Sequence, residues 1–382
     1  MIIETWLEPL KPMLASWIQS SDWQMLSDFE RSLGEIAQDS AKNSPIQAKT
    51  LLASQGYGTV DVEKTLGGKG CSPLVQALMQ FICGYHDLDY RDVAHVGHGR
   101  MITVHGSEVQ RKLWMPKMAS GTLVGIAATE AHGGSRIQAT KTSAKSAGGS
   151  HFLTGEKVCI SRIKEAEVFV VFFKFEKDET LSAALINLAQ KGVELEQWEA
   201  AGLQGWSWGK VTFENVPFTD QDMLGARGQG MAIFKDHFLY YRPMVAMTTL
   251  GITAAVLNRT LEYTKQRISQ RDITEPRDTF LETVSNHFTT INAGMLFTLC
   301  AIVQNMENSP HSSLWSRMAK AWSVERAHQA VSELALPMGA SVFRSDHFVA
   351  KALRDLRGFL MADGIHDALR RSSGRTLMDL SS

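Results

Sequence analysis

One short pattern carries a residue that could act as a nucleophile. The run GWSWG at 205–209 matches G-x-S-x-G and places Ser207 where hydrolases hold their nucleophilic serine. That serine must lie on a sharp turn between a strand and a helix. Here a strand-like run, KVTFENV at 210–216, follows the pattern. We therefore expect Ser207 to have no catalytic role.

Two further patterns could bind a metal or a nucleotide. His86, His95 and His98 lie close together, but the sequence shows neither the fixed spacing nor the additional ligands of a zinc site. The run LGARGQG at 224–230 does not follow the G-x-G-x-x-G pattern after a strand that dinucleotide folds require. We expect no metal site and no Rossmann domain.

Size and charge set the broad class of the protein. A chain of 382 residues suits two or three domains. A formal net charge of -1 with scattered Lys and Arg does not indicate a nucleic-acid partner. The first residues carry Glu4 and do not resemble a signal peptide, and no stretch has the roughly 20 apolar residues of a membrane span. The four cysteines show no CxxC spacing, which favours reduced thiols in a cytoplasmic protein.

The first 120 or so residues have helical patterns. Ser72 followed by Pro73 is a good helix start, and apolar residues then recur three and four apart as far as Tyr85. The run from Glu108 to Met118 predicts another short helix that ends near Pro116. These patterns predict a helical N-terminal domain over 1–121.

The middle of the chain has strand patterns. The runs 168–175, 182–188 and 210–216 are short, apolar and rich in β-branched or aromatic residues, and Gly148-Gly149 is a turn signal. A compact antiparallel β domain is expected over 122–228.

The remaining residues, 229–382, read as a four-helix bundle. Small residues share one side of a helix near 247–255, and further helices are expected over 279–306, 312–338 and 345–371. The predicted fold is thus mainly α with a central β domain.

Several separated motifs resemble those of the acyl-CoA dehydrogenases. They occur in the order and spacing of that family and span nearly the whole chain. The motifs are GTVDVEKTLGGKG (58–70), GSEVQRKLWMPKMASG (106–121), IAATEAHGGSR (126–136), GLQGWSWGKVTFENVPFTDQDMLG (202–225) and LRDLRGFLMADG (353–364). The resemblance implies an FAD-dependent enzyme that dehydrogenates an acyl thioester between its α and β carbons.

The resemblance assigns the chemistry to Asp363. It lies nine residues after Arg354, where the family places its catalytic Glu, and Gly364 follows as the family's Gly does. A buried carboxylate whose pKa is raised can remove the α proton, although Asp is one methylene shorter than Glu. The backbone N–H of Asp363 and a ribityl hydroxyl of FAD would hold the thioester oxygen. Asp363 could instead be the N-cap of a helix.

The resemblance also implies FAD contacts. Thr129, Ser135 and Ser161 match family positions that contact the flavin, although they could be turn residues without a ligand. Cys159 stands where a Trp commonly covers the flavin, and Arg136 and Leu336 replace a family Asp and Gln. Three further positions are expected to contact FAD: Arg267, Gly339 and Ala340.

Other functions of the same fold stay open. Nitroalkane oxidases belong to the superfamily and use an Asp base, so Asp363 with Arg370 resembles their arrangement, and Arg370 could equally be a surface charge. A degenerate, non-dehydrogenating relative is the third possibility. Tyr241, Arg242, Gly364 and Arg370 are the expected substrate-binding residues. Tyr241 would be a poor base, because a phenol has a pKa of about 10.

The resemblance finally implies partners. The acyl group would be carried by CoA or by a carrier protein, and electrons would pass to an electron-transfer flavoprotein or to oxygen. We expect a homo-oligomer, a dimer or a tetramer, whose neighbouring subunit completes the flavin site.

Overall fold

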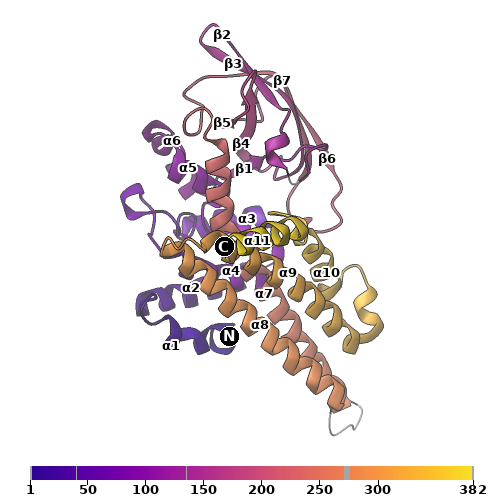
Figure 1. Ribbon diagram of the computed structural model, residues 1–382. Coiled ribbons are helices and arrows are strands. Elements are labelled where there is room, and N and C mark those ends of the chain that lie inside the picture. Colours follow the sequence, from indigo (N-terminus) through magenta and orange to yellow (C-terminus); the bar gives the residue numbers. More distant parts are fainter. Residues whose placement is uncertain (1, 40, 135, 271–275, 381–382) are drawn as a thin grey trace.

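The computed structural model describes residues 2–39, 41–134, 136–270 and 276–380. Helices form its first part, a seven-stranded sheet its middle and longer helices its last part (Figure 1). The mainly α fold with a central β domain is therefore confirmed. The helical elements before the sheet are η1 (Ile3–Leu7), η2 (Glu8–Leu10), α1 (Lys11–Leu14), α2 (Ser20–Gln38), α3 (Pro45–Ser54), η3 (Lys64–Leu66), α4 (Pro73–His86), η4 (Leu88–Asp92), η5 (Gly97–Gly99), α5 (Arg100–His105) and α6 (Glu108–Ala119).

The N-terminal helices begin and end close to the residues that the sequence predicts. The Ser72 hydroxyl caps α4 by accepting a hydrogen bond from the Val75 N–H. The helix predicted over Glu108 to Met118 is confirmed to within one residue, and Pro116 lies inside its last turn. A proline removes one backbone hydrogen bond, and burial of Trp114, Met115 and Met118 in the core holds the last turn in place.

The strands form one mixed sheet in the order β1-β4-β2-β3-β7-β6, with β5 paired to β4. Four pairs are antiparallel, as expected: β2–β3, β3–β7, β4–β5 and β6–β7. The expectation of a purely antiparallel domain is wrong, because β4 pairs in parallel with β1 and β2. Local patterns identify strands, whereas long-range connections fix their direction. The strands are β1 (Leu123–Ala127), β2 (Ser143–Ala147), β3 (Ser150–Ser161), β4 (Ala166–Phe175), β5 (Leu181–Ile186), β6 (Val193–Trp198) and β7 (Trp208–Phe218), with the short η6 (Ile137–Ala139) before β2.

Strand β4 is buried on both faces. Phe169 and Phe173 point into one hydrophobic cluster inside the β domain, and Phe172 points to the other face, into a cluster with residues of α5 and α6. This alternation follows from the two-residue period of a strand. The sheet is therefore fixed against the N-terminal helices.

The longest helix, α7, runs from the sheet through the helical part of the molecule (Figure 1). A Cβ on Gly84 of α4 would lie 1.9 Å from the carbonyl oxygen of Thr248, and one on Gly251 of α7 would lie 2.1 Å from that of Phe81. The small residues of α7 thus pack against α4 of the same chain. The small residues near 247–255 therefore allow a close helix–helix approach within one chain.

The last elements differ from the expected four helices. They are α7 (Gly230–Gln270), α8 (Asp278–Met306), α9 (Ser312–Ala335), η7 (Leu336–Phe343), α10 (Phe348–Phe359) and α11 (His366–Leu380). The single helix expected over 345–371 is wrong, because the chain breaks between α10 and α11. Asp363 and Gly364 have φ of 55° and 107° there, a left-handed conformation that no α-helix accommodates.

Two helices, α7 and α8, are long and apolar enough to cross a membrane by length and composition. The most apolar window of α7 is 83% buried inside the protein, and that of α8 is 44% buried. Burial accounts for the apolar composition of α7 as a core helix of the fold.

Candidate active site

Thr129 lies on the segment next to β3, and β3 carries Cys159 and Ser161 near its end. The Val158 N–H donates to the Thr129 carbonyl oxygen at 2.9 Å, which joins the segment after β1 to β3. The register of β3 against β7 shifts between Lys157 and Ile160, and Cys159 has a φ of 59°. Such a bulge re-aims side chains. Thr129 and Cys159 are exposed and Ser161 is half-buried, so three small side chains form an open face.

A buried ion pair supports this open face. Lys157 has no exposed surface, and its Nζ donates to Glu130 at 2.7 Å and to the Ala128 carbonyl oxygen at 3.1 Å. Burial would raise the pKa of Glu130, but hydrogen bonds from Lys157 and Thr142 lower it to about 2. Burial lowers the pKa of Lys157 to about 8, against the attraction of Glu130. The pair fixes the segment that carries Thr129 onto β3.

Asp363 lies in the break between α10 and α11, and two cations hold its backbone. The Arg242 Nε donates to the Asp363 carbonyl oxygen at 3.0 Å, and the Lys320 Nζ donates to the Gly364 carbonyl oxygen at 3.0 Å. Gly364 has a φ of 107°, which residues with a Cβ rarely adopt, so glycine is favoured there. The first residues of α11 bond to Ile365 rather than to Asp363, so the alternative in which Asp363 is an N-cap is not supported.

The surroundings of Asp363 suit a base. Burial raises the pKa of its carboxyl group, and Lys320, Arg242 and Arg91 pull that pKa back down. Burial also lowers the pKa of Lys320 to about 7 and that of Arg242 to about 10. Asp363 is thus partly desolvated and has the permanently charged Arg242 and Arg91 and the weakly basic Lys320 around it, which is the balance that tunes a carboxylate toward proton abstraction.

A buried ionic network, which the sequence did not reveal, lies between these two sets of residues. Arg162 pairs with Asp92, and its Nη1 donates to the Ser161 hydroxyl at 3.1 Å. The Arg91 Nε lies 3.3 Å from the same Asp92 oxygen. The positive charge of Arg91 in turn lowers the pKa of Asp363. In the sequence these charges stand in charge-rich runs, DLDYRD at 87–92 and SRIKEAE at 161–167, and charged residues of such runs usually lie on the surface.

Tyr241 faces neutral histidines rather than open solvent. Its hydroxyl lies 2.9 Å from His95 Nδ1, which already accepts from the Gly97 N–H, so Tyr241 is the donor. The Tyr241 ring stacks on His237 at 4.7 Å between centroids, and His237 bonds to His98 at 2.9 Å. Burial raises the pKa of Tyr241 well above 10 and lowers those of His98 and His237. Tyr241 is not a base in this arrangement.

Other residues predicted for the site lie elsewhere. Arg370 pairs with Glu325, which also bonds His366, whereas Lys320, Arg242 and Arg91 are the cations that lower the pKa of Asp363. Arg267 lies at the far end of α7, where it bonds Tyr263. Gly339 and Ala340 lie exposed in η7, beside the α9 end of the bundle. Ser135 lies outside the described residues.

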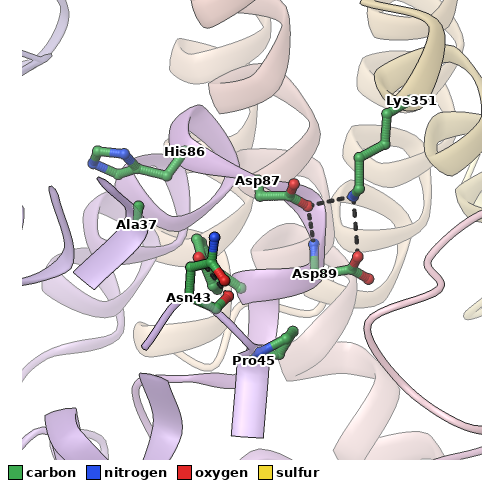
Figure 2. Close-up of a pocket in the computed structure, with 8 residues that line it drawn as sticks. Ala37, Asn43, Pro45, His86, Asp87, Asp89 and Lys351 are labelled. Atoms are coloured by element: carbon green, nitrogen blue, oxygen red, sulfur yellow. Dashed lines mark hydrogen bonds and ion pairs between the residues drawn. The ribbon is translucent and has the colours of Figure 1, made fainter. Parts of the chain in front are cut away.

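The cavity in Figure 2 is lined by Lys351 and by Asp89, which lies 3.8 Å from Arg91 of the ionic network. It has a volume of about 250 Å³. Asp87, Asp89 and Asp355 are close enough together to hold a metal ion, but the Lys351 Nζ contacts all three at 2.6, 3.0 and 2.6 Å. The lysine occupies the place that a cation would take.

The other motifs considered in the sequence have structural roles. The Ser207 hydroxyl donates to Glu165 at 2.5 Å and accepts from the Lys164 N–H at 3.0 Å. It lies directly before β7, so no strand–turn–helix elbow is present around it, as the sequence predicts. His95 and His98 bond to Tyr241 and His237 rather than to a common ligand.

Comparison with known proteins gives consistent matches along the chain. Sequence profiles of the acyl-CoA dehydrogenase N-terminal, middle and C-terminal domains match residues 29–122, 125–216 and 228–378. An acyl-CoA dehydrogenase of Bacillus subtilis (strain 168) is 24% identical over 91% of this chain and 94% of its own length.

Solved structures share the fold. A glutaryl-coenzyme A dehydrogenase in complex with glutaryl-CoA has a TM-score of 0.87 at 20% identity, over 95% of this chain and 96% of that one. The FAD complex of PigA has a TM-score of 0.84 at 20% identity, over 94% of this chain and 98% of that one.

Proposed function

This chain belongs to the acyl-CoA dehydrogenase family, and we propose that it removes hydrogen from the α and β carbons of an acyl thioester with Asp363 as the base. Membership makes it an FAD-dependent oxidoreductase acting on CH–CH groups. The observation that carries the assignment of the base is the position of Asp363 in a glycine-containing break, surrounded by Lys320, Arg242 and Arg91.

The residues on the β domain fit FAD. Thr129, Cys159 and Ser161 are small and form an exposed face on which a planar ring can lie. FAD supplies the acceptor for the hydride that leaves the β carbon. The Thr129 and Ser161 hydroxyls would hold the ring by hydrogen bonds, and the Glu130–Lys157 pair would keep this face rigid.

Asp363 would take the α proton on a carboxylate oxygen. The charge left behind on the substrate spreads to the thioester oxygen, which needs hydrogen-bond donors. The backbone N–H of Asp363 is the proposed donor, and the contacts of Arg242 and Lys320 with the carbonyl oxygens of Asp363 and Gly364 hold the two peptides that follow it in place. Gly364, which has no side chain, would let the substrate approach the backbone. Arg242 would affect substrate binding indirectly, by holding the Asp363 carbonyl oxygen.

A second candidate is an oxygen-using flavoenzyme of the same fold. Cys159 is exposed where the resemblance places a covering Trp, which leaves the ring face open to small molecules. The nitroalkane oxidase arrangement has less support, because Arg370 pairs with Glu325 and lies apart from Asp363. Oxygen therefore competes with an electron-transfer flavoprotein as the proposed acceptor.

We also propose a homo-oligomer with domains over 1–121, 122–228 and 229–382. Arg267, Gly339 and Ala340 lie far along the bundle from the β domain, so they could touch FAD only from a second copy. Apolar side chains support this, since Leu281, Phe288 and Leu296 of α8 are 45–49% exposed.

The test is anaerobic mixing of the FAD-loaded protein with acyl-pantetheine thioesters and, separately, with nitroethane. Pantetheine is the arm that CoA and carrier proteins share, so the probe does not depend on which of them is the carrier. Bleaching of the flavin by a thioester alone is the expected result. Bleaching by nitroethane alone would overturn the proposal.

A further inference from the structure

The cavity in Figure 2 lies between the N-terminal helices and α10, and none of the residues that line it is assigned above to the flavin or the substrate. It has room for roughly eight non-hydrogen atoms, if each takes the volume of about 30 Å³ that one water molecule has in the liquid. The side chains of Asp87 and Lys351 are 25% and 33% exposed, so the cavity opens to solvent beside them. Asp89 is only 5% exposed and forms a buried part of the wall.

The wall of the cavity carries more negative than positive charge. The Lys351 ammonium contacts Asp87, Asp89 and Asp355, and these contacts use all three of its N–H groups. Three carboxylates around one ammonium leave two negative charges unbalanced. Burial lowers the pKa of Lys351, yet the three carboxylates raise it above its ordinary value of 10.5, which is the effect expected of excess negative charge.

The arginines nearest to Asp89 have other carboxylates beside them. The Arg91 Nη1 lies 3.8 Å from the Asp89 Oδ1, which is beyond hydrogen-bond distance, and the Arg91 Nε lies 3.3 Å from Asp92. Arg162 also pairs with Asp92, and Asp363 adds a second negative charge near these arginines. The two arginines and these two carboxylates balance each other, so the negative charge of the cavity wall remains.

The groups on the His86 side of the cavity do not balance the wall either. Burial lowers the pKa of Arg259, and the nearby Glu262 and Asp87 raise it, so this arginine is shared with a carboxylate outside the cavity. His86 is neutral near pH 7, because burial lowers its pKa to about 4. In Figure 2, His86 and Asp89 lie on opposite sides of Asp87.

Two buried polar atoms of the lining residues have no partner. The Asp89 Oδ1 and the His86 Nε2 make no hydrogen bond in the part of the chain that the structure describes. The Asp89 Oδ2 already accepts from the Gly205 N–H at 3.1 Å and from Lys351 at 3.0 Å. A buried acceptor without a donor is costly, and most so when it is charged. A ligand with positively charged N–H groups would satisfy this carboxylate.

We propose that this cavity binds a short aliphatic diamine of about four carbons. One ammonium group would bind Asp87 and Asp89. The carbon chain would pack against Ala37 and Pro45, and the second ammonium would lie near His86, whose neutral ring can accept a hydrogen bond. Two ammonium groups match the two unbalanced negative charges. The inference does not depend on the dehydrogenation proposed above.

The test is isothermal titration calorimetry of the FAD-loaded protein with putrescine, a four-carbon diamine, and with butanediol, which has hydroxyl groups in place of the amines. Putrescine should bind one to one, with an affinity about 10- to 100-fold higher than that of butanediol, the range given by hydrogen bonds to charged groups. Butylamine, with one amine, should bind with an intermediate affinity. Equal affinities, or no saturable binding of putrescine, overturn the inference. Saturable binding of Mg²⁺ that excludes putrescine also overturns it, because the site would then be a metal site.

Asp89→Asn tests the carboxylate. The amide has nearly the same shape, and its oxygen can keep the bonds to Gly205 and Lys351, but the negative charge is lost. Putrescine affinity should fall at least tenfold, and butanediol affinity should not change. The matched control is Asp346→Asn, at a carboxylate that is 66% exposed in the loop before α10, and it should bind putrescine as the wild type does.

A second variant keeps the inference testable if Asp89→Asn does not fold. Ala37→Leu adds three carbons to a half-buried side chain of the cavity wall and changes no charge. It should abolish putrescine binding and leave the thermal unfolding midpoint of the free protein nearly unchanged. Wild-type putrescine affinity in either folded variant overturns the assignment of this cavity.

Discussion

The Nζ of Lys320 lies 3.0 Å from the carbonyl oxygen of Gly364, and the lysine side chain has no exposed surface. A residue from the middle of α9 therefore holds the loop that carries Asp363. Burial lowers the pKa of Lys320 from 10.5 to about 7.

This pKa makes stability depend on pH in a defined direction. Between about pH 7 and the pKa of the unfolded lysine, the unfolded chain binds a proton on Lys320 that the folded chain does not. Folding stability therefore rises with pH there, by at most about 1.4 kcal/mol per pH unit. Urea unfolding at pH 7.5 to 9 should show this slope in the wild type and a reduced slope in Lys320→Met. The control is Lys112→Met at an exposed lysine. Parallel curves for all three proteins would contradict the lowered pKa of the buried Lys320.

Asp363→Asn should bind FAD normally and lose flavin reduction, because an amide has nearly the same shape and cannot accept the α proton. Stopped-flow bleaching with the best thioester measures this. Asp363→Glu lengthens the side chain. Flavin reduction should persist in this variant if thioesters are the substrate, whereas the rate of reduction by a nitroalkane would not increase. Undiminished reduction in Asp363→Asn would place the base elsewhere.

Arg242 should set the pH range of the reaction. The rate of flavin reduction falls as pH drops through the pKa of Asp363, which burial raises above 3.8 and Arg242 partly lowers. Removing the cation in Arg242→Met should move this acidic limb to higher pH. Arg370→Met should leave the limb in place, because Arg370 pairs with Glu325. A shift only in the Arg370 variant would favour the nitroalkane oxidase arrangement.

The exposed apolar side of α8 should join two copies of the chain. Leu281 and Leu296 are 49% and 45% exposed and lie on one side of the helix with Phe288. Light scattering at micromolar concentration should give a dimer or tetramer. The double variant Leu281→Glu with Leu296→Glu should shift the oligomeric state toward monomer. It should also weaken the retention of FAD on gel filtration. A wild-type monomer that holds FAD would refute the shared flavin site.

Gly84→Ala should destabilise the protein strongly. Its Cβ would lie 1.9 Å from the Thr248 carbonyl oxygen, so α4 and α7 would have to separate, at a cost of about 1–3 kcal/mol. The control is Gly374→Ala on α11, where a Cβ meets nothing within 4 Å. That change should stabilise the helix by up to roughly 1 kcal/mol. Similar unfolding midpoints for both variants would contradict the close helix contact.

Local patterns were enough to identify most elements and the order of the domains. The start of α4 at Ser72-Pro73 depends on a hydrogen bond between residues three apart. The strand β4 depends on a run of apolar residues. Both signals lie within a few consecutive residues of the sequence. The family motifs, ending in Asp363-Gly364, likewise need only order and spacing. The break at Asp363 was missed, because an Asp-Gly pair is compatible with a helix end or a helix start until its φ is known.

Only the tertiary structure decided which charges are buried together. Arg162 and Asp92 are 70 residues apart, and Lys320 and Gly364 are 44 apart, so no local period relates them. No local pattern predicts that α4 covers the glycine face of α7, or that Arg370 pairs with Glu325. Charge on a sequence is a property of the residue, whereas its pKa and its partner depend on the desolvation and contacts that the whole fold creates.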